Sequence, residues 1–345
     1  MKCAARLANI LHTVFYSVKE LQLTRKKRNP TYVALSGSKP ESPQDDESPD
    51  SWYPRSHQVV MEPFYYLLSN PGKNTLSLLI DAFNEWLQVP EDKLKIIKSV
   101  VNVLHNASLL IDDIQDDSTL RRGFPVTDQV FGTAQTINSA NYAYFLAFRE
   151  LQKLESHEAG MILIHEMINL HLGHGMDLFW RETSICPSET DYLEMVNNKT
   201  GGLYRIMIRL MQLESTCPRD YVDLAEILGK LLQIRDDYKN LQSDFYSQKK
   251  GIYKDITEGK FSFLVIHHMH TDPDSEIVRR IMKQKTDNER IKDVVLSCLS
   301  STGSFEYTER TIKDLARHAE LLIMELDDER KKADAILDLL KMLQI

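Results

Sequence analysis

The chain has 345 residues, a formal net charge of −8 and a hydrophobic fraction of 42%. This length suffices for one large domain or two ordinary ones, and the negative charge argues against nucleic acid as a main partner, because phosphate backbones attract basic surfaces. The four cysteines are scattered without a Cys-x-x-Cys pair and no apolar run is long enough to span a bilayer, so a reducing, cytoplasmic location is expected.

Residues 1–57 are predicted to lie outside the folded domain. Residues 1–28 are basic, with Glu20 as the only acid, and a helix there would be amphipathic. Two alternatives stay open: a mitochondrial transit peptide, and a disordered basic arm, which we favour. Residues 36–54 are rich in Ser, Pro, Asp and Glu, and their low apolar content cannot offset the entropy of ordering. A disordered linker is therefore expected there, and the folded domain is expected over residues 58–345.

From residue 59 onward, apolar residues recur with helical spacing, and few stretches alternate with period two. The run 94–114 is long, apolar and free of Gly and Pro, so it is predicted to be a buried helix, with Pro90 as the first residue of that element. Further helices are expected over residues 59–70, 76–87, 137–154, 160–180, 189–197, 203–213, 221–241 and 263–269, after Asp274, and as a final pair from residue 305 onward. The predicted fold class is all-α, a bundle of long helices around one core.

A cluster of carboxylates ends the long predicted helix, and two arginines follow it. Asp112 and Asp116 are four residues apart, so they share one helix face, where like charges repel. A divalent cation removes that repulsion, and Mg²⁺ prefers one or two carboxylates plus phosphate oxygens. Arg121 and Arg122 are close enough in sequence to bind a phosphate there. A single cluster of this kind is most often a solvated helix end, so the metal hypothesis needs a partner elsewhere in the chain.

Residues 233–240 provide that partner. Asp236 and Asn240 lie four apart on one helix face, with Asp237 beside them, after an apolar run. Two buried helices that carry oxygen ligands can face each other across a bundle and bind metal between them. Bridging cations would hold a diphosphate, and lysines would complete the anion site, although each alone is more often a surface residue. The candidate lysines are Lys199, Lys250 and Lys260.

The chain resembles the trans-isoprenyl diphosphate synthases, most closely an animal-type geranylgeranyl diphosphate synthase, from about Gln58 to its C-terminus. The motifs that carry the resemblance are Pro71-Gly72-Lys73, His105-Asn106-Ala107-Ser108-Leu109-Leu110-Ile111-Asp112-Asp113, Leu120-Arg121-Arg122-Gly123, Lys199-Thr200-Gly201-Gly202, Gln233-Ile234-Arg235-Asp236-Asp237-Tyr238 and Thr257-Glu258-Gly259-Lys260-Phe261-Ser262-Phe263. The resemblance implies the isoprenoid synthase fold, with long helices around a deep central cavity, in a homodimer or higher oligomer. It also implies a prenyl diphosphate substrate and Mg²⁺, as three ions.

The resemblance further assigns roles to individual residues. The metal ligands that it implies are Asp112, Asp113, Asp116, Asp236, Asp237 and Asn240. The residues expected to bind the allylic diphosphate are Arg121, Lys199, Thr200, Gln233, Lys250 and Lys260. Those expected to bind isopentenyl diphosphate are Lys73, His105 and Arg122. Ionisation itself is assigned to Asp112, Asp113, Asp116, Lys199 and Asp236, because metal ions and cations stabilise the departing diphosphate.

One departure from the family pattern bears on the reaction. The family has an arginine three residues after the lysine of the Pro-Gly-Lys motif, but this chain has Leu76 there. A hydrogen bond to a charged group contributes roughly 1.5–3 kcal/mol, so its loss would weaken isopentenyl diphosphate binding by about 10- to 100-fold. Leu264 also replaces a usual proline. Residues 204–209 are large where the family has small ones. Two alternatives stay open: these residues reshape one wall of the pocket, or Arg205 and Arg209 face solvent as an i,i+4 pair, which we slightly favour.

These departures favour a terpene synthase that ionises a prenyl diphosphate without isopentenyl diphosphate. Geranylgeranyl diphosphate is the expected substrate, because the small Ala107 and Ser108 leave room for a long chain. Two alternatives stay open. The retained Lys73, His105 and Arg122 fit a geranylgeranyl or farnesyl diphosphate synthase with a weakened isopentenyl site. The other alternative is a non-catalytic modulatory subunit of such a synthase, which would not need both Asp-rich motifs.

Overall fold

The computed structural model describes residues 52–70, 72, 75–242, 253–327 and 332–345. Its helices are α2 (Trp52–Leu68), α3 (Thr75–Leu87), α4 (Glu91–Gln115), α5 (Thr127–Phe131), α6 (Thr133–Leu151), the 3-10 helix η1 (Gln152–Leu154), α7 (His157–Thr183), α8 (Glu189–Lys199), α9 (Gly201–Leu213), α10 (Val222–Gln242), α12 (Lys254–Glu258), α13 (Phe263–Thr271), α14 (Ile277–Gln284), α15 (Glu289–Ser301), α16 (Ser304–Asp327) and α17 (Asp334–Leu343). One hairpin, β1 (Leu120–Arg121) and β2 (Phe124–Pro125), completes the described secondary structure. The all-α prediction is confirmed. The predicted arm, most of the linker, Lys73 and Lys250 lie outside the described residues.

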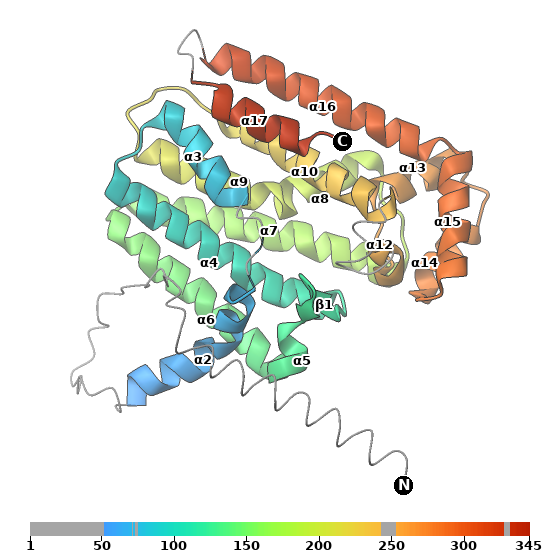
Figure 1. Ribbon diagram of the computed structural model, residues 1–345, viewed down its shortest axis with the longest axis horizontal. Helices are drawn as coiled ribbons and strands as arrows, with labels where there is room; N and C mark the ends of the chain where they lie inside the picture. The colour runs from blue at the N-terminus through green and yellow to red at the C-terminus, as the bar shows by residue number, and fades with distance from the viewer. Residues whose placement is uncertain (1–51, 71, 73–74, 243–252, 328–331) are drawn as a thin grey trace. The chain divides into compact units, whose positions relative to one another are not determined.

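The predicted buried helix is α4, which packs against α2, α3, α6 and α9 (Figure 1). Among its apolar residues, Ile97, Val101 and Leu110 are fully buried. Pro90 occupies the N-cap with extended backbone, one position before the predicted one. Within the described residues, α4 is also the one helix long and apolar enough to cross a membrane, but half of its apolar stretch is buried against neighbouring helices. This burial is typical of a core helix, so the apolar run is accounted for by packing.

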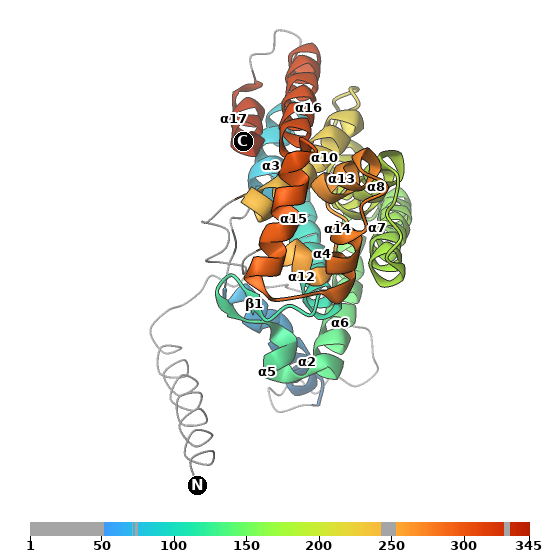
Figure 2. The ribbon, with the colours of Figure 1, turned by 90° about the vertical axis from the view of Figure 1, so that its right-hand side faces the viewer.

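Helix α10 packs against α9, α13 and α16. Helices α16 and α17 lie side by side, and α17 also contacts α3, in the region where Figures 1 and 2 both show them together. After Asp274 the chain forms two helices, α14 and α15, where the sequence predicted one. The break follows from Lys285, which has the left-handed φ of 48°, and from Asn288, whose side chain caps the next helix.

The β1–β2 hairpin was not predicted, and it determines where the two arginines point. Arg121 pairs with Phe124, so Arg122 and Gly123 form a two-residue turn. Both turn residues have positive φ, 57° for Arg122 and 84° for Gly123, as a type I′ turn requires. Arg121 ends β1 and bonds to Asp112 and Asp113, whereas Arg122 lies in the turn and bonds to the carbonyl of Asn70, so the hairpin directs the two arginines towards different parts of the molecule.

Candidate active site

The first Asp-rich motif lies in the last turn of α4, where two arginines neutralise it. Arg121 from the hairpin donates to Asp112 Oδ2 at 3.0 Å and to Asp113 Oδ1 at 2.7 Å. Arg181 from α7 donates to Asp116 Oδ1 at 2.6 Å. Burial alone would raise the pKa of Asp112, but Lys199 and Arg121 together lower it. The carboxylate of Asp112 is therefore held in its charged form by neighbouring cations.

A lysine and a carboxylate from different helices meet beside this cluster. Lys199, the last residue of α8, donates to Asp177 Oδ2 of α7 at 2.6 Å. Burial would lower the pKa of Lys199, but Asp177 and Asp112 outweigh it and raise that pKa. Nearby, His174 Nε2 lies 2.5 Å from Gln115 Oε1 of α4. The predicted anion-binding lysine is therefore placed next to the first Asp-rich motif.

The second Asp-rich motif contributes an anchoring residue, Asp237. It is 1% exposed. Its Oδ2 accepts from Tyr192 Oη at 2.6 Å and from Phe263 N at 2.9 Å. Its Oδ1 accepts from Gln233 Nε2 at 2.9 Å and lies 3.4 Å from Lys260 Nζ. Because protein donors occupy both oxygens, this geometry fits an anchor that ties α8, α10 and α13 together better than the predicted metal ligand.

The other predicted ligands of α10 lie close to a short loop around α12. Asn240 Oδ1 accepts from the backbone N–H of Asp255 at 3.2 Å, so it also fixes the loop. Burial raises the pKa of Asp255 to about 8; Lys260 opposes this shift, and Asp237, Glu258 and Asp236 add to it. Of the second motif, Asp236 is the residue that best fits the predicted metal ligation.

The two motifs face a common group of charges, and Lys260 links them. Burial would lower the pKa of Lys260, but Asp255, Asp237 and Asp177 raise it strongly. Lys260 is also among the cations that lower the pKa of Asp112. On the same side, Lys254 donates to Ser118 Oγ, directly after the first motif, at 2.6 Å. The loop that carries Lys254 and Asp255 therefore contacts both the chain after the first motif and Asn240 of α10.

The carboxylates of this region are suitable ligands for Mg²⁺, but in this structure they do not meet at one point. Among the described residues, no group of three His, Cys, Asp or Glu side chains is close enough to hold a metal ion. The carboxylates instead point at Arg121, Arg181 and Lys199. Buried oxygens without a partner persist on Asp113 and Asp255. Carboxylate oxygens are the ligands that Mg²⁺ prefers, so the residues fit the ion once these ion pairs rearrange.

The predicted isopentenyl diphosphate side lies on the other face of the hairpin. Arg122 Nη1 donates to the carbonyl of Asn70 at 2.6 Å. Its guanidinium lies against Gly72, where a Cβ atom would be 2.7 Å from Arg122 Nη2. Burial lowers the pKa of His105 to about 4, with help from Arg122 and Arg121, so its imidazole is neutral at pH 7. Leu76, at the position of the missing arginine, is a buried residue of α3.

The expectation that Arg205 and Arg209 face solvent as a pair is wrong for Arg205. Its side chain is 6% exposed and forms an ion pair with Glu166 of α7 at 2.8 Å. Arg209 is half-exposed and donates to the same carboxylate at 2.8 Å. The buried Glu166 attracts both arginines, because an unpaired buried charge costs several kcal/mol. Next to them, Thr200 Oγ1 donates to Gln233 Oε1 at 2.9 Å, which joins two predicted substrate contacts.

Sequence reasoning missed several charged residues of this region. Asp177 and Arg181 lie four residues apart near the C-terminal end of α7. Opposite charges at this spacing on a buried helix are a signal that points to a polar site. Lys254, Asp255 and Glu258 gave a weaker signal, because a charged pentapeptide is equally typical of a surface loop.

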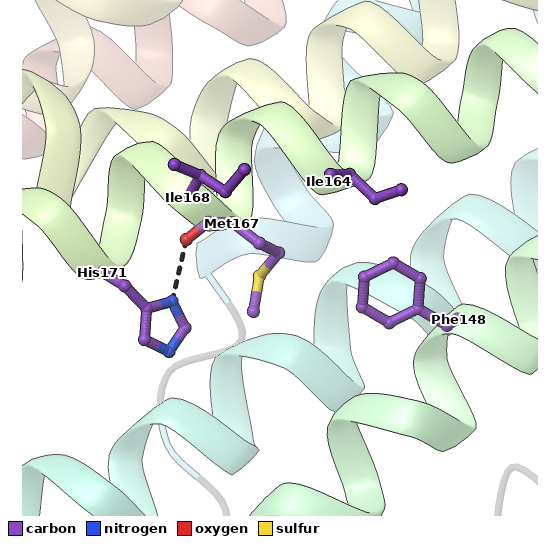
Figure 3. A pocket seen from close by; sticks show the side chains of 5 residues that line it. All are labelled: Phe148, Ile164, Met167, Ile168 and His171. Atoms are coloured by element: carbon purple, nitrogen blue, oxygen red, sulfur yellow. Dashed lines mark hydrogen bonds between the residues drawn. The ribbon is translucent and has the colours of Figure 1, made fainter.

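An apolar groove lies between α6 and α7 (Figure 3). It has a volume of about 410 Å³. Figure 3 shows Phe148 of α6 facing the side chains of α7. The lining residues are Phe148, Ile164, Met167, Ile168 and His171. Its surface suits hydrocarbon or apolar side chains.

Comparison with known proteins gives consistent matches. The family model described as polyprenyl synthetase matches residues 57–299. The geranylgeranyl pyrophosphate synthase of Hypoxylon pulicicidum is 48% identical over 316 residues, which cover 89% of this chain and 82% of the relative. The geranylgeranyl pyrophosphate synthase dpasD of Apiospora sacchari is 52% identical over 281 residues, with 81% and 85% covered. The corresponding synthase idtG of Claviceps paspali is 53% identical over 293 residues, with 84% and 88% covered.

Proposed function

The chain belongs to the polyprenyl synthetase family, and we propose that it is a geranylgeranyl diphosphate synthase that condenses isopentenyl diphosphate with an allylic diphosphate. The observation that carries the proposal is the pair of cationic sides around one hairpin. Arg121 bonds to Asp112 and Asp113 of the first motif, whereas Arg122 bonds to the carbonyl of Asn70. The names of the relatives support the same activity. The farnesyl diphosphate synthase alternative is the same reaction with a shorter product.

The residues of the two motifs have distinct parts in the proposed reaction. Asp112, Asp113 and Asp116 on α4, with Asp236 on α10, would hold Mg²⁺, as three ions. When bound, the metal neutralises the allylic diphosphate and stabilises it as a leaving group. Further positive charge reaches the diphosphate oxygens from Arg121, Lys199 and Lys260. Such preorganised cations are effective because the site is largely buried.

The proposed condensation joins the two substrates and releases inorganic pyrophosphate and a proton. The allylic carbon–oxygen bond breaks, and its electron pair leaves with inorganic pyrophosphate. The double bond of isopentenyl diphosphate then forms a carbon–carbon bond with the allylic cation, and one proton is lost. Arg122 is suited to hold the second diphosphate. His105 is suited to donate a hydrogen bond as a neutral imidazole, because its lowered pKa keeps it uncharged at pH 7.

The terpene synthase hypothesis, which the sequence favoured, is not confirmed. It rested mainly on Leu76, whereas the relatives named above are synthases that match more than four-fifths of this chain. The condensation alternative is therefore the better supported of the two. The modulatory-subunit alternative is less economical, because Asp112, Asp113, Asp116 and Asp236 are all present. A cytoplasmic location stays our expectation.

We also propose that the protein forms a homodimer or higher oligomer through α6 and α7. Large apolar residues form a stripe at helical spacing along α7, including Ile164, Ile168 and Leu172, and Phe145 of α6 is 70% exposed beside them. Exposed apolar surface of this kind marks an interaction site. A second copy fits because the same face occurs on every chain, as a two-fold interface requires. Ile168→Glu should lower the mass measured by analytical ultracentrifugation, whereas Leu321→Glu on α16 should not.

One assay tests the proposed activity. The purified chain with Mg²⁺ is given farnesyl diphosphate with labelled isopentenyl diphosphate, and separately geranylgeranyl diphosphate alone. A labelled, elongated diphosphate from the first mixture is the expected result. A hydrocarbon or alcohol from the second mixture would instead support the terpene synthase. No product in either mixture would support the modulatory subunit.

A further inference from the structure

The junction between α8 and α9 carries two of the predicted substrate contacts. Lys199 is the last residue of α8, and Thr200 precedes Gly201, the first residue of α9. The backbone of Thr200 stays helical, with φ −84° and ψ −46°, and its N–H donates to Val196 O at 2.9 Å. The position of the Lys199 ammonium and the Thr200 hydroxyl therefore depends on how this junction is held.

Two glycines let the junction pack backbone against backbone. A Cβ atom on Gly173 of α7 would lie 2.6 Å from the backbone N of Lys199. A Cβ atom on Gly229 of α10 would lie 3.3 Å from the Cα of Gly201. Contacts this close leave no room for side chains between the helices. The junction is therefore pressed against α7 on one side and α10 on the other.

Arg205 ties the same junction to α7 from one turn further along α9. Its Nη1 donates to the carbonyl of Asn197 in the last turn of α8 at 2.7 Å. Its Nε donates to Glu166 Oε2 at 2.9 Å, and Glu226 of α10 lies 3.4 Å from Nη1. Carbonyls in the last turn of a helix lack intrahelical partners, and arginine side chains often supply one. Arg205 therefore caps α8 while its charge is paired on α7 and α10.

The contact between Arg205 and the end of α8 requires a glycine at position 201. A Cβ atom on Gly201 would lie 3.2 Å from Arg205 Nη1 and 3.0 Å from Asn197 Oδ1, so a larger residue would displace the guanidinium. Arg209 makes a useful contrast. It lies one turn further along the same helix and donates to the other oxygen of Glu166, but from the half-exposed side of the helix. Arg205 therefore differs from Arg209 in its contact with α8.

We propose that Arg205, held by Glu166, is a positioning residue that fixes the end of α8 and so places Lys199 and Thr200 for the allylic diphosphate. The identity of that ligand rests on the proposed function. A buried ion pair alone is weak evidence for stabilisation, because apolar residues of similar volume are often as stabilising. An apolar residue at position 205 could fill the same volume, but it could not donate the hydrogen bond to the Asn197 carbonyl.

The kinetic test compares Arg205→Met with Arg209→Met. Arg205→Met should raise the KM for the allylic diphosphate, or lower kcat, by about 10- to 100-fold, because small displacements of a positioning group have effects of this size. The KM for isopentenyl diphosphate should stay unchanged, and Arg209→Met should change neither constant. Equal rises in both KM values for Arg205→Met would overturn the proposal.

The double variant Arg205→Met with Glu166→Met separates positioning from stability. It removes both buried charges, so the melting temperature should return towards that of the wild type, while the allylic KM stays raised. Recovery of both quantities would show that the pair only stabilises the fold. Arg205→Lys should behave in the same way as the double variant, because lysine keeps the charge but lacks the fork that reaches Glu166 and Asn197 together.

A readout without catalysis distinguishes failure of this proposal from failure of the proposed function. Amide hydrogen exchange at Lys199 and Thr200 should be at least tenfold faster in the double variant than in the wild type, and unchanged in Arg209→Met. Mg²⁺ with inorganic pyrophosphate should also bind about tenfold more weakly to the double variant. If the wild type forms no elongated product, these two measurements still decide the role of Arg205. Unchanged exchange and unchanged pyrophosphate binding would contradict it.

Discussion

The two faces of the hairpin differ in how they hold their charges. On the allylic side, Arg121 bonds to Asp112 and Asp113, and Arg181 bonds to Asp116, all within 3.0 Å. On the isopentenyl side, Arg122 bonds to a backbone carbonyl, and Leu76 is apolar. The first side is a network of fixed counter-charges, which is suited to metal ions and ionisation. The second side has fewer fixed charges, so the affinity for the second substrate should be easier to change than the chemistry.

The largest effect is expected from Asp112→Asn, which removes a carboxylate from the allylic network. Because this residue is a proposed metal ligand among fixed cations, product formation should fall by about 100- to 1,000-fold. Steady-state rates at saturating Mg²⁺ measure the loss. The matched control is Asp117→Asn, since Asp117 lies five residues along in the same motif region but is exposed. A comparable loss in Asp117→Asn would show that net charge, rather than ligation, matters.

Replacing Asp237 should mainly lower the free energy of unfolding, whereas replacing Asp236 should mainly lower the activity. Asp237→Asn breaks a buried network of donors to both oxygens, so the free energy of unfolding should fall by about 3–5 kcal/mol. Asp236→Asn should keep most of the stability and lose most of the activity. Urea unfolding and product assays on both variants provide the comparison. If Asp237→Asn were as stable as the wild type, the anchoring role would be wrong.

The lowered pKa values of His105 and His174 predict how the free energy of unfolding depends on pH. The pKa of His105 is lowered from 6.5 to about 4, chiefly by burial, so between these values the unfolded chain binds a proton that the folded protein excludes. The stabilisation is complete above about pH 6.5 and is lost as the pH falls to about 4, by about 3 kcal/mol. The pKa of His174 is lowered to about 4 as well, chiefly by burial, so two groups contribute.

A variant separates the contribution of His105 from that of His174. His105→Gln should reduce the loss of unfolding free energy between pH 6.5 and 4 by about half, as measured by urea unfolding at several pH values. His165→Gln, at an exposed position of α7, serves as the control. An unchanged pH dependence in His105→Gln would mean that its imidazole is not excluded from protonation by the fold.

The smallest change is expected from Leu76→Arg, which strengthens the weaker side. A restored cation should lower the KM for isopentenyl diphosphate by about tenfold, which corresponds to one charged hydrogen bond. The KM for the allylic substrate should not change. Leu76→Met, which conserves volume and apolar character, is the control. If Leu76→Arg left isopentenyl diphosphate use unchanged, the missing arginine would not explain the difference between the two sides.

The fold followed from the sequence wherever long apolar periodicity decided it. Helix α4 was expected because twenty residues or so without Gly or Pro favour one buried helix. The helices after Asp274 were less predictable, since Lys285 reverses the chain without a glycine or proline to mark it. The hairpin was missed because a two-residue strand has no period to detect. Its turn was nevertheless encoded by Gly123.

The sequence indicated which residues belong to the candidate site more clearly than what each of them does there. Lys199 bonds to Asp177, and Lys260 pairs with Asp237, so both predicted lysines lie beside buried carboxylates. Asp237 was predicted to be a metal ligand and Arg205 to face solvent, because the sequence does not show which side of a helix is buried by polar partners. Asp237 bonds to Tyr192 and Phe263, contacts that its sequence position beside Asp236 does not reveal.

The most direct test of the account is a crystal structure with Mg²⁺ and a non-hydrolysable allylic diphosphate analogue. We predict that oxygens of Asp112 and Asp236 bind metal ions on one and the same diphosphate, with Arg121 and Lys199 turned from their carboxylates towards its oxygens. A diphosphate bound elsewhere, with the ion pairs of Arg121 and Lys199 intact, would contradict the central claim that these two motifs form one ionising site.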